Sequence, residues 1–139
     1  MKRKLTLFLT LLMLASLLLT ACAKEEPVGL WKNATYQNDR SFGKGAKTVL
    51  VEVAAEDKTV TFTVKTDADT VGAALLENDL IAGEDSEYGL YVKVVNGMTA
   101  DYDVDQSYWA FYIGGEYAMT GVDATEIEEG TTYRLAYTK

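Results

Sequence analysis

The sequence lacks histidine and is poor in cysteine, proline and cationic residues. Its 139 residues include no histidine, one cysteine and one proline, and 13 lysines and arginines stand against 21 aspartates and glutamates. Without histidine the chain has neither the commonest general base nor the commonest metal ligand among side chains. One cysteine can form neither an internal disulfide nor a thiolate zinc site. The fold must therefore be held together by its hydrophobic core.

The charge of the chain argues against nucleic acid as a partner. The formal net charge is −8, and it becomes −11 if the three cationic residues at positions 2–4 are removed with an export leader. Binding to a phosphate backbone needs clustered lysine and arginine, which this composition does not supply.

The first 22 residues have the pattern of an exported lipoprotein. A basic start at residues 2–4 precedes an apolar run over residues 5–19, which is shorter than the roughly 20 residues that a spanning helix prefers. The run closes as Leu19-Thr20-Ala21-Cys22, which resembles the bacterial lipobox, whose cysteine receives diacylglycerol. The alternative is an uncleaved anchor that contains an ordinary cysteine.

We therefore expect three segments. Residues 1–21 are predicted to be a lipoprotein signal peptide, residues 22–46 a lipid-anchored tether that starts at Cys22, and residues 47–139 one folded domain. Acyl chains such as palmitate on Cys22 would hold the protein on the cell membrane, facing outside the cytoplasm. Trp31, within the tether, is expected to pack back onto the domain, with a role in ligand binding as the alternative.

The pattern from residue 48 onward predicts an α+β domain. Two runs of alternating apolar residues, 48–53 and 59–65, indicate a β-hairpin, and residues 71–78 have the spacing of a short amphipathic helix. Further strands are predicted over residues 88–95, 108–113, 116–119 and 131–137. This order favours a β-grasp-like mixed sheet with one short packed helix, in which the last strand lies parallel to the first.

The second half of the chain resembles a known family. The segments Asp69-Thr70-Val71, 108–117 and Gly121-Val122-Asp123, together with Gly130, are similar to a bacterial family of uncharacterised domains of the DUF4430 type. That family resembles the C-terminal β-domain of transcobalamin and intrinsic factor, which are cobalamin carriers. The resemblance implies a β-grasp-like domain that lays aromatic and backbone groups against a corrin ring. It also implies that the helical domain of the carriers is absent here.

The strand over residues 108–113 holds the candidate ligand-binding residues. Alternation places Tyr108 and Tyr112 on one face and Trp109 on the other, and one of these faces must be core. If Trp109 is core, the tyrosines and Tyr117 form an exposed aromatic patch, whereas the resemblance to the carriers favours Trp109 as a ligand-facing residue. We therefore take Tyr108, Trp109, Tyr112 and Tyr117 as the candidate site.

Metal binding and catalysis have weaker support. Asp101, Asp103 and Asp105 alternate as at the start of a calcium loop, but Gln106 and Tyr112 stand where an EF-hand needs glycine and glutamate. A solvated acidic loop is the expectation, with an irregular calcium site as the alternative. No nucleophile has an evident base partner, so we expect no enzyme, no catalytic residue and no metal site.

These observations lead to two functional hypotheses. The first is a surface-tethered, non-catalytic capture module for a small ligand, with cobalamin or another corrinoid as the candidate, that passes its cargo to an uptake transporter. Its partners would be the membrane, through the lipid anchor, and that ligand, with no covalent cofactor besides the lipid. The alternative is an extracellular protein-interaction or adhesion module without a small-molecule ligand.

Overall fold

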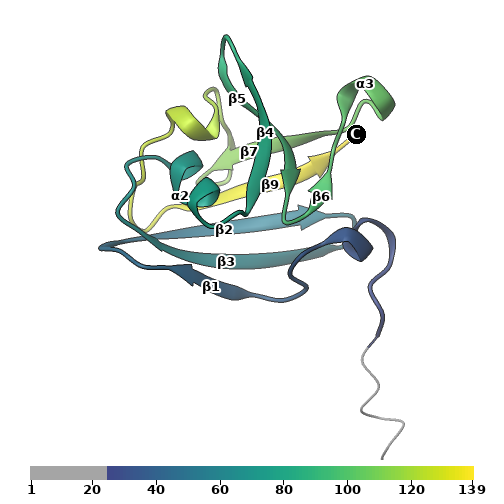
Figure 1. Cartoon of the computed structure of the whole chain (residues 1–139), viewed down its shortest axis with the longest axis horizontal. Helices are drawn as coiled ribbons and strands as arrows, with labels where there is room; N and C mark the ends of the chain where they lie inside the picture. Colours follow the sequence, from purple (N-terminus) through teal and green to yellow (C-terminus); the bar gives the residue numbers. More distant parts are fainter. Residues whose placement is uncertain (1–24) are drawn as a thin grey trace, which may run out of the picture.

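A computed structural model describes residues 25–139, so Cys22 and the predicted signal peptide lie outside the described residues. Within that range the chain forms one six-stranded sheet, the main sheet, and a second sheet of three strands (Figure 1). In the same residues no helix is both long and apolar enough to cross a lipid bilayer. The main sheet has the order β1-β3-β2-β9-β7-β8, made by β1 (Arg40–Gly43), β2 (Lys47–Ala55), β3 (Lys58–Thr66), β7 (Tyr108–Ile113), β8 (Glu116–Tyr117) and β9 (Thr132–Thr138).

The centre of the main sheet confirms the β-grasp-like prediction. Strands β2 and β3 form the expected antiparallel hairpin, and the last strand, β9, pairs with β2 in parallel. Alternating valines of the hairpin are buried because every second side chain points to the same face of a sheet. Tyr133 and Leu135 of β9 are each 1% exposed and complete that buried face.

Helix α2 (Val71–Glu77) covers the buried face, as the apolar spacing predicts. It begins after Thr70, whose side-chain oxygen accepts a hydrogen bond from the amide of Ala73 at 3.2 Å, so one of the free amides of the first turn is satisfied. Val71, Ala74 and Leu75 are buried against the sheet. So short a helix depends on this packing rather than on its own propensity.

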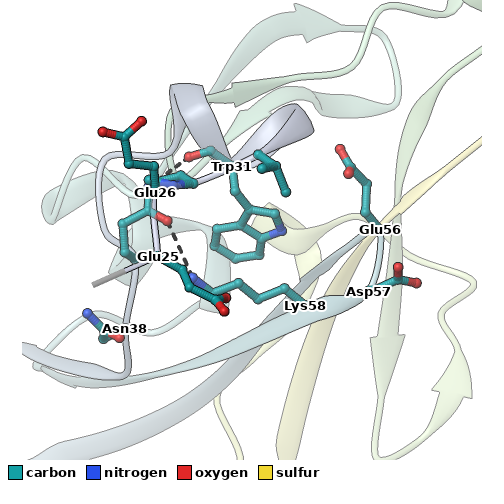
Figure 2. Close-up of a pocket in the computed structure, with 10 residues that line it drawn as sticks. Glu25, Glu26, Trp31, Asn38, Glu56, Asp57 and Lys58 are labelled. Atoms are coloured by element: carbon teal, nitrogen blue, oxygen red, sulfur yellow. Dashed lines mark hydrogen bonds between the residues drawn. The ribbon is translucent and has the colours of Figure 1, made fainter. Parts of the chain in front are cut away.

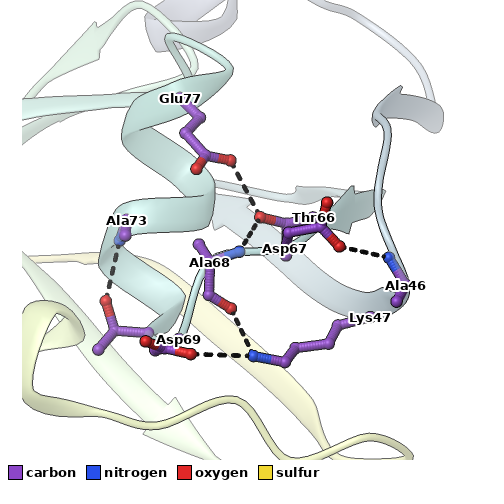
Figure 3. A network of polar contacts seen from close by, with 9 residues as sticks. Ala46, Lys47, Thr66, Asp67, Ala68, Asp69, Ala73 and Glu77 are labelled. Atoms are coloured by element: carbon purple, nitrogen blue, oxygen red, sulfur yellow. Dashed lines mark hydrogen bonds and ion pairs between the residues drawn. The ribbon is translucent and has the colours of Figure 1, made fainter.

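A polar network fixes α2 to the ends of the hairpin strands (Figure 3). The buried hydroxyl of Thr66 donates to Glu77 at 2.9 Å and accepts from the amide of Ala68 at 3.0 Å. The ammonium group of Lys47 donates to the carbonyl of Ala68 at 2.9 Å and pairs with Asp69 at 3.2 Å. Both the start and the end of α2 are thereby tied to the strands below it.

The second sheet contains the element that the sequence pattern did not reveal. Strand β5 (Gly89–Val95) matches the predicted strand closely, but it pairs with β4 (Ile81–Ser86) and β6 (Met98–Thr99) rather than joining the main sheet. Residues 84–86 of β4 are polar or acidic, and such a run is more typical of a solvated loop than of a strand. All residues of β4 except Ile81 are exposed, so no alternation of apolar and polar residues marks this edge strand.

The Gly121-Val122-Asp123 motif packs beneath α2. It begins the 3-10 helix η2 (Val122–Ala124), whose Val122 is buried. A side chain at Gly72 of α2 would stand 2.8 Å from the Cα of Asp123, so only glycine allows this close approach. The Asp123 carboxylate accepts a hydrogen bond from the amide of Leu90 at 3.0 Å and so links η2 to β5.

The folded unit starts earlier than the predicted domain start at residue 47. The 3-10 helix η1 (Gly29–Asn33) and strand β1 lie within the segment that was expected to be a tether. Trp31 is 3% exposed, and its indole N–H donates to the carbonyl of Ala55 at 2.9 Å. The side-chain amide of Asn96, itself buried, donates to the carbonyl of Tyr36 and accepts from its amide. The chain from residue 29 is therefore part of the domain.

The acidic segment at residues 101–105 forms helix α3 (Tyr102–Asp105), a second short α-helix besides the one expected. Asp101 caps it by accepting from the amide of Asp103, and Asp105 accepts from both the amide and the hydroxyl of Ser107. Across residues 25–139 no three acidic or cysteine side chains lie close enough together to hold a metal ion. In this structure Asp101 and Asp105 serve as hydrogen-bond acceptors for neighbouring residues.

We predict that Trp31→Ala lowers the free energy of unfolding by about 3–5 kcal/mol, because it removes a large buried side chain and leaves a cavity. Urea denaturation would measure this change. Val28→Ala is the matched control, since Val28 lies in the same segment but is 71% exposed, and its effect should stay within about 0.5 kcal/mol. A loss below about 1 kcal/mol for Trp31→Ala would mean that the segment is not an integral part of the domain.

Asp105 is predicted to give the protein part of its acid sensitivity. Hydrogen bonds from Ser107, and then the nearby charge of Lys139, lower the pKa of the Asp105 carboxyl below its ordinary value. A lowered pKa in the folded state contributes stability above the unfolded pKa of about 4, and this contribution is lost as the pH falls through the folded value. Asp105→Asn should therefore lower the melting temperature at pH 7. Near pH 2 the melting temperature of the variant should approach that of the parent protein.

Thermal denaturation between pH 7 and pH 2 would check this behaviour. Asp103→Asn removes the same charge from α3 without touching Ser107, and it should leave the pH dependence almost unchanged. The prediction would be contradicted if the difference in melting temperature between Asp105→Asn and the parent protein stayed constant from pH 7 to pH 2.

Candidate functional site

The main sheet has one covered face and one open face. Helix α2 and the second sheet lie on the covered side (Figure 1). Of the described strand residues that alternate onto the other side, which we call the open face, only Ala110 is buried. This face carries Thr48, Leu50, Glu52, Ala54, Thr59, Thr61, Thr63, Lys65, Tyr108, Ala110, Tyr112, Tyr117, Thr132, Arg134, Ala136 and Thr138.

The structure separates the four candidate residues between the two faces. Tyr108 and Tyr112 are half-buried on the open face, and Tyr117 is 59% exposed beside them. Trp109 lies on the covered face, where it is 7% exposed and its indole N–H donates to the carbonyl of Lys93 at 3.2 Å. The rings of Trp109 and Tyr137 also meet edge to face at 5.7 Å. Trp109 thus packs in the core, and the three tyrosines remain accessible.

A tight turn brings two of the tyrosines together. Gly114 and Gly115 join β7 to β8 with φ angles of 57° and 87°, a conformation that favours glycine at both positions. The turn pairs Tyr117 with Tyr112 across the two strands, so both side chains point to the open face. Their ring centroids are 5.6 Å apart, and the rings meet edge to face. This pair forms one end of the aromatic surface.

Four residues from four strands form a row across the open face, in the order Tyr117, Tyr112, Arg134 and Glu52. Strand pairing places Tyr112 next to Arg134 of β9, and Arg134 next to Glu52 of β2. Direct cross-strand neighbours of this kind have Cβ atoms about 5 Å apart. The row therefore runs from aromatic side chains at the sheet edge to a pair of opposite charges near its centre.

Small residues lie beside this row. Ala110, Ala136 and Ala54 are cross-strand neighbours in the next position along the strands, and we call them the alanine trough. On its far side stands Tyr108, paired with Thr138. Tyr108 and Tyr112 are four residues apart on one strand, which corresponds to about 13 Å. Ala110 is 2% exposed, so neighbouring side chains already cover it, and the accessible part of the trough is formed by Ala136 and Ala54.

A hollow of about 360 Å³ opens along this row. Its walls include the ring of Tyr112, the guanidinium group of Arg134 and the carboxylate of Glu52. The ion pair between Arg134 and Glu52 is 3.6 Å long, and both side chains are partly exposed. The hollow therefore combines an aromatic wall with charged groups of both signs. It is lined by Glu52, Tyr112, Gly115, Thr132, Arg134 and Ala136.

A second, larger hollow of about 830 Å³ lies beside Trp31 (Figure 2). The ammonium group of Lys58 sits 4.7 Å from the centre of the Trp31 ring, and the Glu56 carboxylate accepts from the amide of Leu30. These contacts attach η1 to the turn between β2 and β3. One signal for this hollow is visible in the sequence, namely an isolated tryptophan in a polar segment. Its lining is Glu25, Glu26, Pro27, Val28, Trp31, Gln37, Asn38, Glu56, Asp57 and Lys58.

Sequence reasoning missed the charged part of the open face. Arg134 and Glu52 are 82 positions apart in the chain and meet only through the pairing of β2 with β9. Neither residue stands in a recognisable motif. The alternation of the last strand was the one available signal, because it placed Arg134 on the face opposite Tyr133 and Leu135.

Comparisons with known proteins agree with this fold. The chain is similar to the crystal structure of "a putative metal binding protein" from Ruminococcus gnavus ATCC 29149, with 34% identity, a TM-score of 0.64, and coverage of 68% of this chain and 98% of that one. It is also similar in fold to haptocorrin in complex with Cbi, with 20% identity and a TM-score of 0.53 over 70% of this chain.

The matched part spans only 26% of the haptocorrin chain, and at this identity the likeness concerns the fold alone. It agrees with the expected resemblance to the β-domain of the cobalamin carriers. No curated protein sequence matches this chain. The family described as "Domain of unknown function (DUF4430)" matches residues 68–139, more than half of the sequence. The chain therefore belongs to the DUF4430 family.

Proposed function

We propose that this protein is a non-catalytic capture module that binds a flat small ligand, with a corrinoid as the candidate, on the open face of its main sheet. The observation that carries the proposal is the exposure of Tyr108, Tyr112 and Tyr117 on one face, around the alanine trough and beside a hollow. A tyrosine platform suits a flat ligand because each ring offers a large contact area and loses little conformational entropy on binding.

The size of the platform favours a macrocycle over a single ring. Tyr108 and Tyr112 stand about 13 Å apart, and the low side chains of Ala110 and Ala136 lie between them. A ligand that touches both tyrosines must cover the alanine trough. Since the chain contains no histidine, a corrinoid would be held by stacking and hydrogen bonds and not by an imidazole on its cobalt.

The comparisons support ligand binding in general terms. One similar structure is described as metal binding and the other contains Cbi. Within residues 25–139 no cluster of acidic or cysteine side chains suits a free metal ion. The geometry of the described residues therefore favours a flat organic ligand over a metal ion alone.

We further propose that the module is tethered to the outside of the cell membrane by lipid on Cys22, with an uptake transporter as the recipient of its cargo. The lipobox-like Leu19-Thr20-Ala21-Cys22 supports this location. Two or more acyl chains hold a protein on a bilayer stably, whereas one chain binds only marginally. The seven residues 22–28 then separate the lipid from η1 at Gly29.

Cys22→Ser is predicted to abolish lipid attachment, because serine lacks the thiol that is alkylated, and to leave the leader uncleaved, because cleavage follows lipidation. Mass spectrometry of the N-terminal peptide and cell fractionation would measure both effects. Thr20→Ser keeps a small residue beside the cleavage position and should leave lipidation intact. An uncleaved N-terminus and an unmodified Cys22 in the parent protein would instead indicate an ordinary membrane anchor.

Tyr112→Ala is predicted to weaken the binding of cyanocobalamin by about three- to tenfold, because it removes a stacking contact of about 0.5–1.5 kcal/mol. Isothermal titration calorimetry on the purified protein would measure the affinity. Tyr88→Ala is the matched control, since Tyr88 is 88% exposed but belongs to the turn between β4 and β5.

Two outcomes would count against this ligand. The first is the absence of saturable binding to the parent protein, and the second is an equal effect of Tyr112→Ala and Tyr88→Ala. Capture of an envelope protein without any added corrinoid, lost in Tyr112→Ala, would favour the protein-interaction module instead.

A further inference from the structure

We infer that Arg134 binds an oxyanion group, a carboxylate or a phosphate, on the ligand that rests on the open face. This inference rests on the proposed function and adds to it the chemical class of the ligand. In this inference the hollow of about 360 Å³ receives the oxyanion group of the ligand. The tyrosines would hold the flat part of the same molecule.

The guanidinium group of Arg134 has unused hydrogen-bonding capacity. Within residues 25–139 its one polar contact is the 3.6 Å ion pair with Glu52, which is longer than a good hydrogen bond. A guanidinium group carries five N–H donors in a planar fork that matches the two oxygens of a carboxylate or phosphate. The side chain of Arg134 is 43% exposed and lines the hollow, so a ligand can reach these donors.

The position of Arg134 joins the anion site to the aromatic platform. Arg134 and Tyr112 are direct cross-strand neighbours, and both line the same hollow. A ring stacked on Tyr112 therefore has its edge beside the guanidinium group. Ala136, the next residue on the same face of β9, leaves the approach from the alanine trough free of tall side chains.

The hollow carries no net charge, although the whole chain is acidic. Arg134 and Glu52 are the charged residues of its lining, so its formal charge is 0 in a chain of −8, and an anion meets less repulsion there than on the acidic surface elsewhere. The acidic residues outside this face discourage non-specific binding of anions elsewhere. The preference for an acidic ligand over a neutral one would thus arise from a single residue, Arg134.

Glu52 competes with the ligand for the same guanidinium group. Its side chain is 34% exposed, and a pair as exposed as this one contributes little stability. An oxyanion that forms two direct, charge-assisted hydrogen bonds with Arg134 can therefore replace or share this contact at small cost. Glu52 would limit the affinity for the anion while it keeps the guanidinium group at the hollow.

The hollow beside Trp31 has the opposite character (Figure 2). Its lining includes the carboxylates of Glu25, Glu26, Glu56 and Asp57, and the one cation there, Lys58, lies over the indole ring. An oxyanion would be repelled at that surface. These two hollows are therefore distinguished by charge, and of the two the one at Arg134 suits an acidic ligand.

The inference is tested with pairs of corrinoids that differ in one acidic group. Dicyanocobinamide and its phosphate form one pair, and dicyanocobyric acid and its primary amide form the second, so the two arms separate phosphate from carboxylate recognition. We expect the parent protein to bind at least one acidic member about tenfold more tightly than its neutral partner, as measured by calorimetry at low salt.

Three variants locate the effect. Arg134→Gln should remove the preference for the acidic member while the neutral member keeps its affinity. Arg134→Lys keeps the charge but not the planar fork, and it should retain only part of the preference. Glu52→Gln should increase the affinity for the acidic member severalfold, because it removes the competing carboxylate. Circular dichroism and thermal denaturation verify that each variant is folded.

The outcomes distinguish the two proposals. Equal binding of both members of each pair, unchanged in Arg134→Gln, would overturn the assignment of Arg134 and leave the capture function standing. Failure of all four corrinoids to bind would overturn the proposed function, and the anion site with it. An acidic preference that survives in Arg134→Gln would show that another residue binds the anion.

Discussion

The parallel pairing of β2 with β9 is the interaction on which the rest of the structure depends. It joins the hairpin formed early in the chain to the last strand, with Leu50 next to Thr132 and Ala54 next to Ala136. Because side chains alternate between faces, this register decides which residues are buried and which are exposed. A slip by one residue would send Leu135 to solvent and Arg134 into the core, so the burial of Tyr133 and Leu135 stabilises one register strongly.

The same register assembles the proposed binding surface. Glu52, Arg134 and Tyr112 come from three different strands and form one row only because β9 lies between β2 and β7. The covered face of those strands supplies the core, and the open face needs no large apolar residue for stability. The sheet therefore assigns the core to one face and the proposed ligand-binding surface to the other.

The N-terminal segment links this domain to its proposed membrane anchor. Trp31 is buried at the end of the β2–β3 hairpin, and Asn96 holds the backbone of Tyr36 against the turn between β5 and β6. These contacts fix the chain close to the point where the predicted tether begins. Of the predicted tether, residues 29–46 belong to the domain, so the linker between the domain and the proposed lipid would be short.

The amino-acid sequence by itself determined the local elements whose signals lie within a few residues, namely the β2–β3 hairpin and helix α2. It also limited Trp109 to two environments, the core or a ligand-binding surface. Alternation places its side chain on the face opposite to Tyr108 and Tyr112. Strand β4 escaped detection because an exposed edge strand has no apolar periodicity. The burial of Trp31, the separate second sheet and the meeting of Arg134 with Glu52 were decided only by the tertiary structure. Each of these depends on contacts between residues distant in the chain, and no local pattern encodes such contacts.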